Sequence, residues 1–353
     1  MANTHGTIPR INFAGIDPAT AAGPGGDSSS QWAAVRAAVM DALSDHGAFE
    51  AVMDGLISPE LTAAMMGPGG AAESFFSLPP STKALYTDKE RPYLGYVSSF
   101  IPGMPYESLS VMDPLSPDAV PSLAGLMWPG TGNPSFSETV QAYMEKVSAL
   151  EAVVRRMVLE SVGAAAEHAG EQGKATSLRL RLSAYLAPGT AEGRVGLPAH
   201  RDTSLLSVLT QNGIDGIEVE LGRGAGGGGG GGWARAELSP VVGGEGGWAR
   251  PALSPGGFLV LAGDMLRVLT NGRVFSPLHR VVVAGERTRY SCILFSNPGD
   301  DVVVQAVDGA VDAEHPAVYK PFVYSEYLGF IFSKEQYKNP NKLETFAAVG
   351  IDG

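Results

Sequence analysis

Ten residues in the middle of the chain set the class of fold: Ser177-Leu178-Arg179-Leu180-Arg181-Leu182-Ser183-Ala184-Tyr185-Leu186. Apolar and polar side chains alternate here with a period of two, which is typical of a β-strand with one buried face. Similar runs predict further strands at 204–210, 215–221, 257–262, 265–270, 278–284 and 289–296. Asn271-Gly272 predicts a two-residue hairpin turn between two of them, and Pro188–Ala199 is expected to be a loop.

The sequence before this stretch has helical periodicity. It predicts a helix over 31–46 that Gly47 ends, and a helix that begins at Ser58-Pro59. The longest helix is predicted over 136–162, with Ser135 and Glu138 at capping-box spacing and Gly163 as its end. Residues 87–135 are rich in Pro and Gly and are expected to form loops. Helices followed by strands favour an α+β fold with a mostly antiparallel sheet, sandwich or barrel.

Composition limits the possible functions. The chain has 353 residues, 44 % of them apolar, and a formal net charge of −12. Such acidity argues against a nucleic-acid partner, since that affinity rests on clustered Lys and Arg. Cys292 is the only cysteine, which excludes a disulfide within the chain. No signal peptide and no apolar run of the ~20 residues needed to span a membrane is visible. We therefore expect a cytoplasmic protein without a membrane partner; the sequence leaves the oligomeric state open, with a monomer expected.

A glycine-rich insertion occupies residues 222–247. Residues 224–232 are nearly all glycine, and 231–240 nearly repeat as 246–255. A single repeat does not make a solenoid, so we interpret it as a local duplication that lengthened a hairpin loop. The loop is expected to be flexible and to lie outside the sheet.

Two of the six histidines have neighbours that suggest a metal site. His200 and Asp202 are two positions apart in a segment expected to be extended, so their side chains can point the same way while Arg201 points away. His279 lies in a later predicted strand. Two imidazoles and one carboxylate form the ligand set of non-haem Fe(II) oxygenases, although zinc accepts the same ligands. Three other histidines carry little functional weight: His5 lies at the terminus, and His46 and His168 lie near predicted helix ends.

A possible anion anchor follows ten residues after His279. Arg289 and Ser291 share one face of a predicted strand with Ile293 and Phe295. A guanidinium assisted by a hydroxyl suits a carboxylate. Taken alone, Arg289 could equally form a surface salt bridge. The order Tyr185, His200-x-Asp202, His279, Arg289-x-Ser291 makes the anchor the better interpretation.

Taken together, these motifs resemble the 2-oxoglutarate- and Fe(II)-dependent dioxygenases of the isopenicillin N synthase-like, plant-type superfamily. The resemblance covers about residues 8–347. Segments 263–266, 270–273 and 276–281 look like that family's second-histidine region, and Arg289-Tyr290-Ser291 looks like its co-substrate motif. Segments 8–13, 47–52 and 75–79 resemble its amino-terminal half. Segments 105–109, 128–134 and 314–322 resemble the branch of glucosinolate-side-chain and auxin-oxidising enzymes.

The resemblance implies a distorted double-stranded β-helix (jelly-roll) core with flanking helices mainly from the amino-terminal half. It implies an amino-terminal region over 1–135, a support helix over 136–176, a catalytic core over 177–300 and a carboxy-terminal extension over 301–353. It also implies roles for single residues: iron ligands His200, Asp202 and His279; co-substrate residues Arg289, Ser291 and Tyr185. The sequence departs from the family pattern at Ser183, where asparagine is usual, and at Leu186-Ala187-Pro188.

The activity implied is that of an oxidoreductase using Fe(II), 2-oxoglutarate and O2, with ascorbate stimulating turnover. It would hydroxylate, desaturate or dealkylate a small organic metabolite while 2-oxoglutarate becomes succinate and CO2. Phe100, Tyr106 and Phe295 are candidates for the substrate pocket wall. Two alternatives remain at this point: an Fe(II) oxidase of the same fold that does not use 2-oxoglutarate, and a non-catalytic β-helix binding protein.

Overall fold

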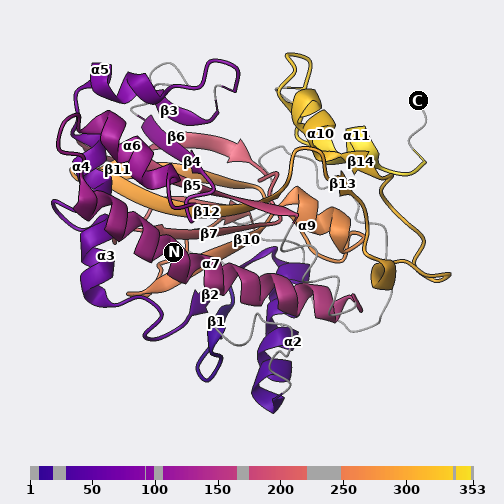
Figure 1. Cartoon of the computed structure of the whole chain (residues 1–353). Coiled ribbons are helices and arrows are strands. Elements are labelled where there is room, and N and C mark those ends of the chain that lie inside the picture. Colours follow the sequence, from indigo (N-terminus) through magenta and orange to yellow (C-terminus); the bar gives the residue numbers. More distant parts are fainter. Residues whose placement is uncertain are drawn as a thin grey trace.

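The protein is a layered structure in which two β-sheets face each other and helices cover the outer side of the larger sheet (Figure 1). The structure, a computed structural model, describes residues 8–18, 29–91, 93–98, 106–164, 175–220, 248–336 and 339–350. The glycine-rich insertion, Phe100, His5 and His168 lie outside these residues. Among the described residues, no helix is both long and apolar enough to cross a membrane.

The larger sheet has eight strands within the described ranges. Their order is β1 (Arg10–Asn12), β2 (Ala48–Val52), β10 (Gly257–Ala262), β7 (Leu206–Gln211), β12 (Arg289–Pro298), β5 (Thr176–Tyr185), β4 (Tyr106–Met112) and β3 (Gly95–Ser98). All pairings are antiparallel except β1 with β2. The facing sheet has the order β6 (Thr190–His200), β11 (His279–Gly285), β8 (Ile217–Glu220) and β9 (Trp248–Ala249). The predicted double-stranded β-helix is confirmed.

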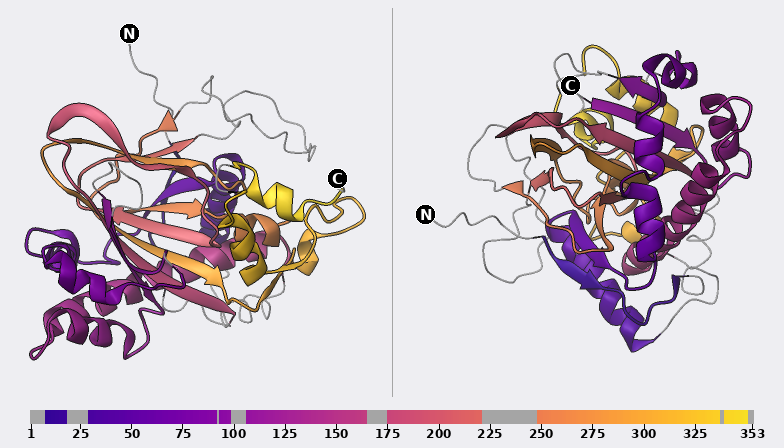
Figure 2. Two further views of the ribbon diagram at one scale, coloured as in Figure 1. Left: turned by 90° about the horizontal axis from the view of Figure 1, so that it is seen from above. Right: turned by 90° about the vertical axis from the view of Figure 1, so that its left-hand side faces the viewer.

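The helices come mainly from the first half of the chain, as predicted. Their bounds are α2 (Ser30–Asp45), α3 (Pro59–Met66), α4 (Ala71–Phe76), α5 (Pro80–Lys83), α6 (Ala119–Met127) and α7 (Pro134–Ser161). The short α9 (Asp264–Leu269) follows β10, and α10 (Tyr324–Ile331), α11 (Lys342–Ala347) and the strand pair β13 (Val303–Val304) and β14 (Phe322–Val323) end the described fold. Figure 2 shows α10 and α11 at the opposite end of the molecule from α3, α4 and α6.

The alternation in β5 produces both the core and the pocket. Leu180, Leu182 and Ala184 point into the main hydrophobic core, which they share with α7. The intervening residues Arg181 and Ser183 point to the space between the sheets. Because side chains alternate across a strand, this one segment supplies an apolar wall for folding and a polar wall for function.

The longest helix differs from its prediction at its start and agrees with it at its end. α7 begins at Pro134, with the Asn133 side chain accepting a hydrogen bond from the Phe136 amide at 3.0 Å. The predicted capping box of Ser135 and Glu138 is therefore wrong, since the asparagine cap starts the helix two residues earlier. The predicted end is confirmed, because Gly163 follows the helix with a φ of +76°.

Four other expectations were wrong. The region 87–135 contains β3, β4 and α6 rather than loops alone, because β4 completes its hydrogen bonds along β5. The expected loop Pro188–Ala199 lies mostly in β6. The side chains of this strand are largely exposed, so the sequence has no alternating apolar pattern there, and the strand forms because it pairs with β11. The expected strand 265–270 is the helix α9, whose six residues are all buried, so apolar periodicity could not distinguish the two forms. Asn271-Gly272 accordingly ends a helix and makes no hairpin.

The start of α9 clamps the segment that follows β6. The amide of Asp264 donates to the carbonyl oxygen of Asp202 at 2.8 Å, and the amide of Gly263 donates to Leu205 at 2.9 Å. A Cβ atom on Gly263 would lie 2.1 Å from the Ser204 carbonyl oxygen. Only glycine therefore allows this approach of two backbones.

We predict that Gly263→Ala destabilises the protein by about 1–3 kcal/mol, as expected for overpacking against a backbone that cannot yield. Urea unfolding measures the change. Gly125→Ala is the control, because its Cβ meets nothing within 4 Å in helix α6; it should be neutral or stabilise by about 0.5–1 kcal/mol. Equal stability of the two variants would contradict the clamp.

Candidate metal centre and anion pocket

Strand pairing brings together the three residues predicted as metal ligands. His200 ends β6, His279 begins β11, and the two are direct partners in the antiparallel ladder. Their ring centroids are 4.2 Å apart. Asp202 lies two residues past β6, with its Oδ1 atom 3.6 Å from the Nε2 atom of each histidine. Within the described residues, this is the one group of His, Cys, Asp and Glu side chains spaced to hold a metal ion.

Hydrogen bonds outside the cluster fix how the three ligands face inward. The Nδ1 atom of His200 lies 2.9 Å from the Pro198 carbonyl oxygen, and that of His279 lies 3.3 Å from Pro277. A carbonyl can only accept, so each Nδ1 carries the proton and each Nε2 keeps its lone pair for the centre of the cluster. On Asp202, Oδ2 accepts a 2.6 Å hydrogen bond from Ser207, which leaves Oδ1 to face the histidines.

The protonation states suit a divalent cation. Burial and the neighbouring His279 lower the pKa of His200 to about 4, so this ring is neutral at pH 7. Burial acts to raise the pKa of Asp202, but His279, His200 and the Ser207 hydroxyl together bring it below its usual value. The donor set is two imidazole nitrogens and one carboxylate oxygen. This is the ligand chemistry of non-haem Fe(II) sites, and the residues present fit that ion.

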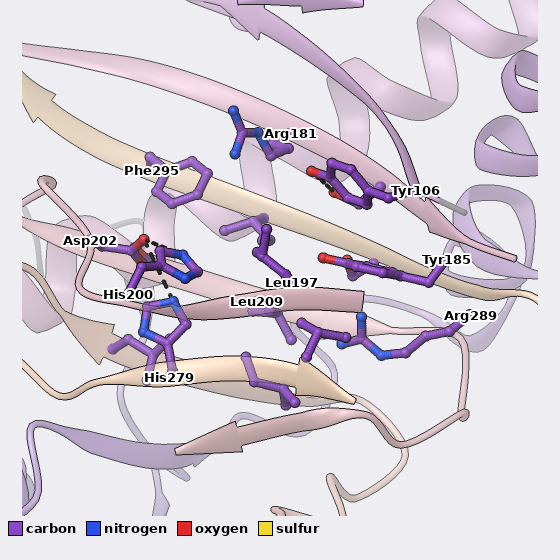
Figure 3. Close-up of a pocket in the computed structure, with 17 residues that line it drawn as sticks. Tyr106, Arg181, Tyr185, Leu197, His200, Asp202, Leu209, His279, Arg289 and Phe295 are labelled. Atoms are coloured by element: carbon purple, nitrogen blue, oxygen red, sulfur yellow. Dashed lines mark hydrogen bonds and ion pairs between the residues drawn. The ribbon is translucent and has the colours of Figure 1, made fainter. Parts of the chain in front are cut away.

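A pocket extends from this cluster between the two sheets (Figure 3). It encloses about 430 Å³ of space unfilled by protein atoms, including the part open to solvent. Its apolar walls come from both sheets: Leu197, Leu209, Ile217, Leu261, Val281 and Ile293. Tyr106 and Phe295, predicted from the sequence as wall residues, both line it.

Arg289 lies at the other end of the pocket from the histidines, as Figure 3 shows. It is 1 % exposed, and its Nε and Nη2 atoms donate to the Gln211 side-chain oxygen at 3.2 and 3.0 Å. Its Nη1 atom and the Ser291 hydroxyl are buried without a hydrogen-bond partner among the described residues. Buried polar groups are nearly always paired. Two unpaired ones beside a cationic group therefore indicate the place of an absent anion.

Tyr185 completes this end of the pocket. It is the partner of Arg289 in the β5–β12 ladder, and its ring centroid lies 5.1 Å from the guanidinium carbon. A Cβ atom on Gly216 would lie 2.8 Å from the Arg289 side chain, and one on Gly196 would lie 2.8 Å from the Tyr185 ring. These two glycines make room for the arginine and the tyrosine.

Sequence reasoning missed three residues that the structure places at the site. Gln211, at the end of β7, stands opposite Ser291 in register and orients Arg289. Ser207 orients Asp202. Arg181 lines the pocket on the polar face of β5. Of the three, only Arg181 had a signal in the sequence, namely its polar position in the alternating stretch. Gln211 and Ser207 had none, because their partners depend on strand register, which the sequence does not show.

Comparison with known proteins agrees with this geometry. Residues 179–298 match the 2OG-Fe(II) oxygenase superfamily model. "Probable 2-oxoglutarate-dependent dioxygenase AOP1.2" of Arabidopsis thaliana is 34 % identical, with 91 % of each chain covered. The crystal structure of the rice dioxygenase for auxin oxidation has a TM-score of 0.72 and 26 % identity, covering 97 % of this chain and all of that one. An Arabidopsis thaliana enzyme of the same name, in a binary complex with 2-oxoglutarate, is alike in fold, with a TM-score of 0.69 and 21 % identity over 88 % of this chain and 100 % of that one.

We predict that Asp202→Ala abolishes Fe(II) binding while the protein stays folded, because the substitution removes a ligand from a segment held by backbone hydrogen bonds. Anaerobic calorimetric titration with Fe(II), together with circular dichroism, measures both properties. Asp312→Ala is the control: it also removes a carboxylate bonded to a histidine, His315, but on the surface. Wild-type Fe(II) affinity in Asp202→Ala would disprove the assignment.

Proposed function

The chain belongs to the 2-oxoglutarate-dependent dioxygenases of the 2OG-Fe(II) oxygenase superfamily, and we propose that the pocket between its two sheets is the active site. The protein is an oxidoreductase that oxidises a small organic molecule and uses Fe(II) and 2-oxoglutarate. The proposal assigns the iron to His200, Asp202 and His279. It assigns the distal carboxylate of 2-oxoglutarate to Arg289 and Ser291.

When bound, the iron and 2-oxoglutarate would allow O2 to oxidise the substrate, with one oxygen atom of O2 entering the succinate that forms, together with CO2, from 2-oxoglutarate. The chain's own residues supply orientation and a dry pocket. Ser207 and the Pro198 and Pro277 carbonyls hold the three ligands in their inward orientation. The apolar wall residues limit the access of water, which strengthens the attraction between the buried Arg289 and a carboxylate.

One observation carries the assignment of 2-oxoglutarate to this pocket. The Arg289 Nη1 atom and the Ser291 hydroxyl are buried and lack partners, and they line the same pocket as the metal ligands. The Gln211 side-chain oxygen accepts hydrogen bonds from the other edge of the guanidinium, but it is uncharged and leaves the positive charge in place. A diacid bound at the iron by one end can meet this unpaired donor pair with the other. An Fe(II) oxidase without 2-oxoglutarate would leave both groups unsatisfied, so this observation favours the 2-oxoglutarate-dependent reaction.

The proposal extends to the setting of the enzyme. We place it in the isopenicillin N synthase-like group, as a cytoplasmic monomer without a nucleic-acid partner. The net charge of −12 supports the last point. We also keep the division into an amino-terminal region over 1–135, a support region over 136–176 that contains most of helix α7, a catalytic core over 177–300 and a carboxy-terminal extension over 301–353.

A metabolite panel tests the function directly. Purified protein is supplied with Fe(II), ascorbate, 2-oxoglutarate and air, and substrate-dependent succinate is measured by mass spectrometry. We expect succinate in proportion to oxidised product, and none when 2-oxoglutarate is omitted. Oxygen uptake without succinate would point instead to the 2-oxoglutarate-independent oxidase. Failure to bind Fe(II) under anaerobic conditions would point to a binding protein.

We predict that Arg289→Ala raises the 2-oxoglutarate concentration needed for half-maximal binding by about thirtyfold or more, since losing one partner of a buried charge pair costs about 2 kcal/mol or more. Fe(II) affinity should stay within about twofold. Arg280→Ala is the matched control, because Arg280 belongs to the same barrel but pairs with Glu218 outside the pocket. An equal loss of iron and 2-oxoglutarate affinity in Arg289→Ala would count against the assigned role.

A further inference from the structure

A second arginine faces the pocket, at a place that the assignment of iron and 2-oxoglutarate does not use. The pocket-lining row of β5 runs from Tyr185 through Ser183 to Arg181. Arg179 comes two residues before Arg181, opposite Phe295 in the ladder, and does not itself line the pocket. Tyr185 stands beside Arg289, whereas Arg181 lines the pocket four residues farther along the strand. Figure 3 shows Arg181 and Arg289 in different parts of the pocket, with Phe295 near Arg181. At about 3.3 Å per residue, the two levels of the strand lie about 13 Å apart.

Arg181 is fixed in place but not neutralised. Its Nε atom donates to the Ser110 hydroxyl at 3.2 Å, and its Nη2 atom donates to the Tyr93 carbonyl oxygen at 3.0 Å. Both acceptors are uncharged. In the part of the chain that the structure describes, no carboxylate forms an ion pair with Arg181 or Arg179. These contacts therefore orient a full positive charge and leave it uncompensated.

Arg179 strengthens the charge at the same place. Its guanidinium carbon lies 4.6 Å from the centroid of the Phe295 ring, and that of Arg181 lies 5.9 Å from the same centroid. The Nε atom of Arg179 is buried without a hydrogen-bond partner. Burial and the neighbouring Arg181 lower the pKa of Arg179 to about 10, which still leaves it charged at pH 7. Two like charges beside one pocket-lining ring are costly unless an anion joins them.

Counting the charges with iron and 2-oxoglutarate bound shows which positive charges still lack an anion. The doubly charged ferrous ion and the doubly charged 2-oxoglutarate cancel each other. Asp202 and Arg289 cancel as well. Arg181 and Arg179 remain, although the chain as a whole carries a net charge of −12. A 2-oxoglutarate molecule held between the metal and Arg289 cannot also reach Arg181, so the remaining charge has to meet a second molecule.

We propose that Arg181, supported by Arg179, binds a carboxylate of the primary substrate, so that this dioxygenase oxidises a small organic acid. Phe295 lies between the two guanidinium groups and the substrate's carbon skeleton as an apolar plate. A planar guanidinium matches the geometry of a carboxylate and attracts it strongly in a pocket that excludes water. This inference rests on the proposed function and names the substrate class for the same site.

The test uses the anaerobic protein loaded with Fe(II) and saturating 2-oxoglutarate. Its probes are a panel of small aryl and alkyl carboxylic acids, each paired with the primary amide of the same carbon skeleton. Binding is measured by calorimetry and by thermal shift. We expect the tightest probes to be acids, each binding about tenfold or more tightly than its amide and losing affinity as salt is added. Amides that bind as well as their acids, or acids that bind only by displacing 2-oxoglutarate, would overturn the proposal.

Substitution then locates the anion site. Arg181→Met keeps most of the side chain's length and should abolish the preference for acids over amides, while Fe(II) and 2-oxoglutarate affinities stay unchanged. Arg181→Lys should restore part of the preference. If Arg181→Met does not fold, Arg181→Lys and Arg179→Met replace it as the test variants. Arg280→Met is the control and should keep the full preference. A full acid preference in folded Arg181→Met, or in both Arg181→Lys and Arg179→Met, would refute the site.

The two proposals fail in different ways. A wild-type protein that does not bind Fe(II) and 2-oxoglutarate would reject the proposed function. A wild-type protein that binds both but shows no preference for acids would reject only the substrate class.

Discussion

The site depends on the pairing of His200 with His279 across β6 and β11. Backbone hydrogen bonds of this ladder hold two residues that are far apart in the sequence with their rings 4.2 Å apart. The third ligand is fixed by a different element, because the amide of Asp264 at the start of α9 bonds the Asp202 carbonyl. The buried Asp264 carboxylate in turn accepts hydrogen bonds from Ser276 and from Tyr327 of α10. Helix α10 thereby supports Asp202 through one backbone contact.

Alternation along single strands organises the rest of the pocket. On β5 one face packs into the core while the other presents Tyr185, Ser183 and Arg181 in turn. On β12, Arg289, Ser291 and Phe295 form the matching row in register. The two rows lie side by side, so positions near Arg289 face one end of the pocket and positions near Phe295 face the other. The two proposed anion-binding places thus follow from one strand pair without any special loop.

Sequence patterns predicted the parts of this arrangement that depend on local chemistry. The period-two stretch predicted β5, and the spacing of His200, Asp202 and His279 predicted a ligand set. Patterns failed where a segment's form depends on its neighbours. The exposed strand β6 exists because β11 is beside it, and α9 is helical although all its residues are buried. Gln211 and Ser207 were missed for the same reason: each acts through a partner that only strand register or loop closure brings near.

The positive charge of the pocket has a cost that constrains its purpose. Arg289 is almost fully buried, and the described residues give neither it nor Arg181 and Arg179 an ion pair. Removing a charge from water without a partner is unfavourable, and a hydrophobic residue would stabilise the fold better at each position. Neutral acceptors such as Gln211 and Ser110 reduce this cost only in part, because they satisfy hydrogen bonds and leave the charge. The free-energy cost of burying these arginines is offset only when anions bind to them. The separation of Arg289 from Arg181 along the β5–β12 strand pair then requires two anions, and a single diacid accounts for only one of them.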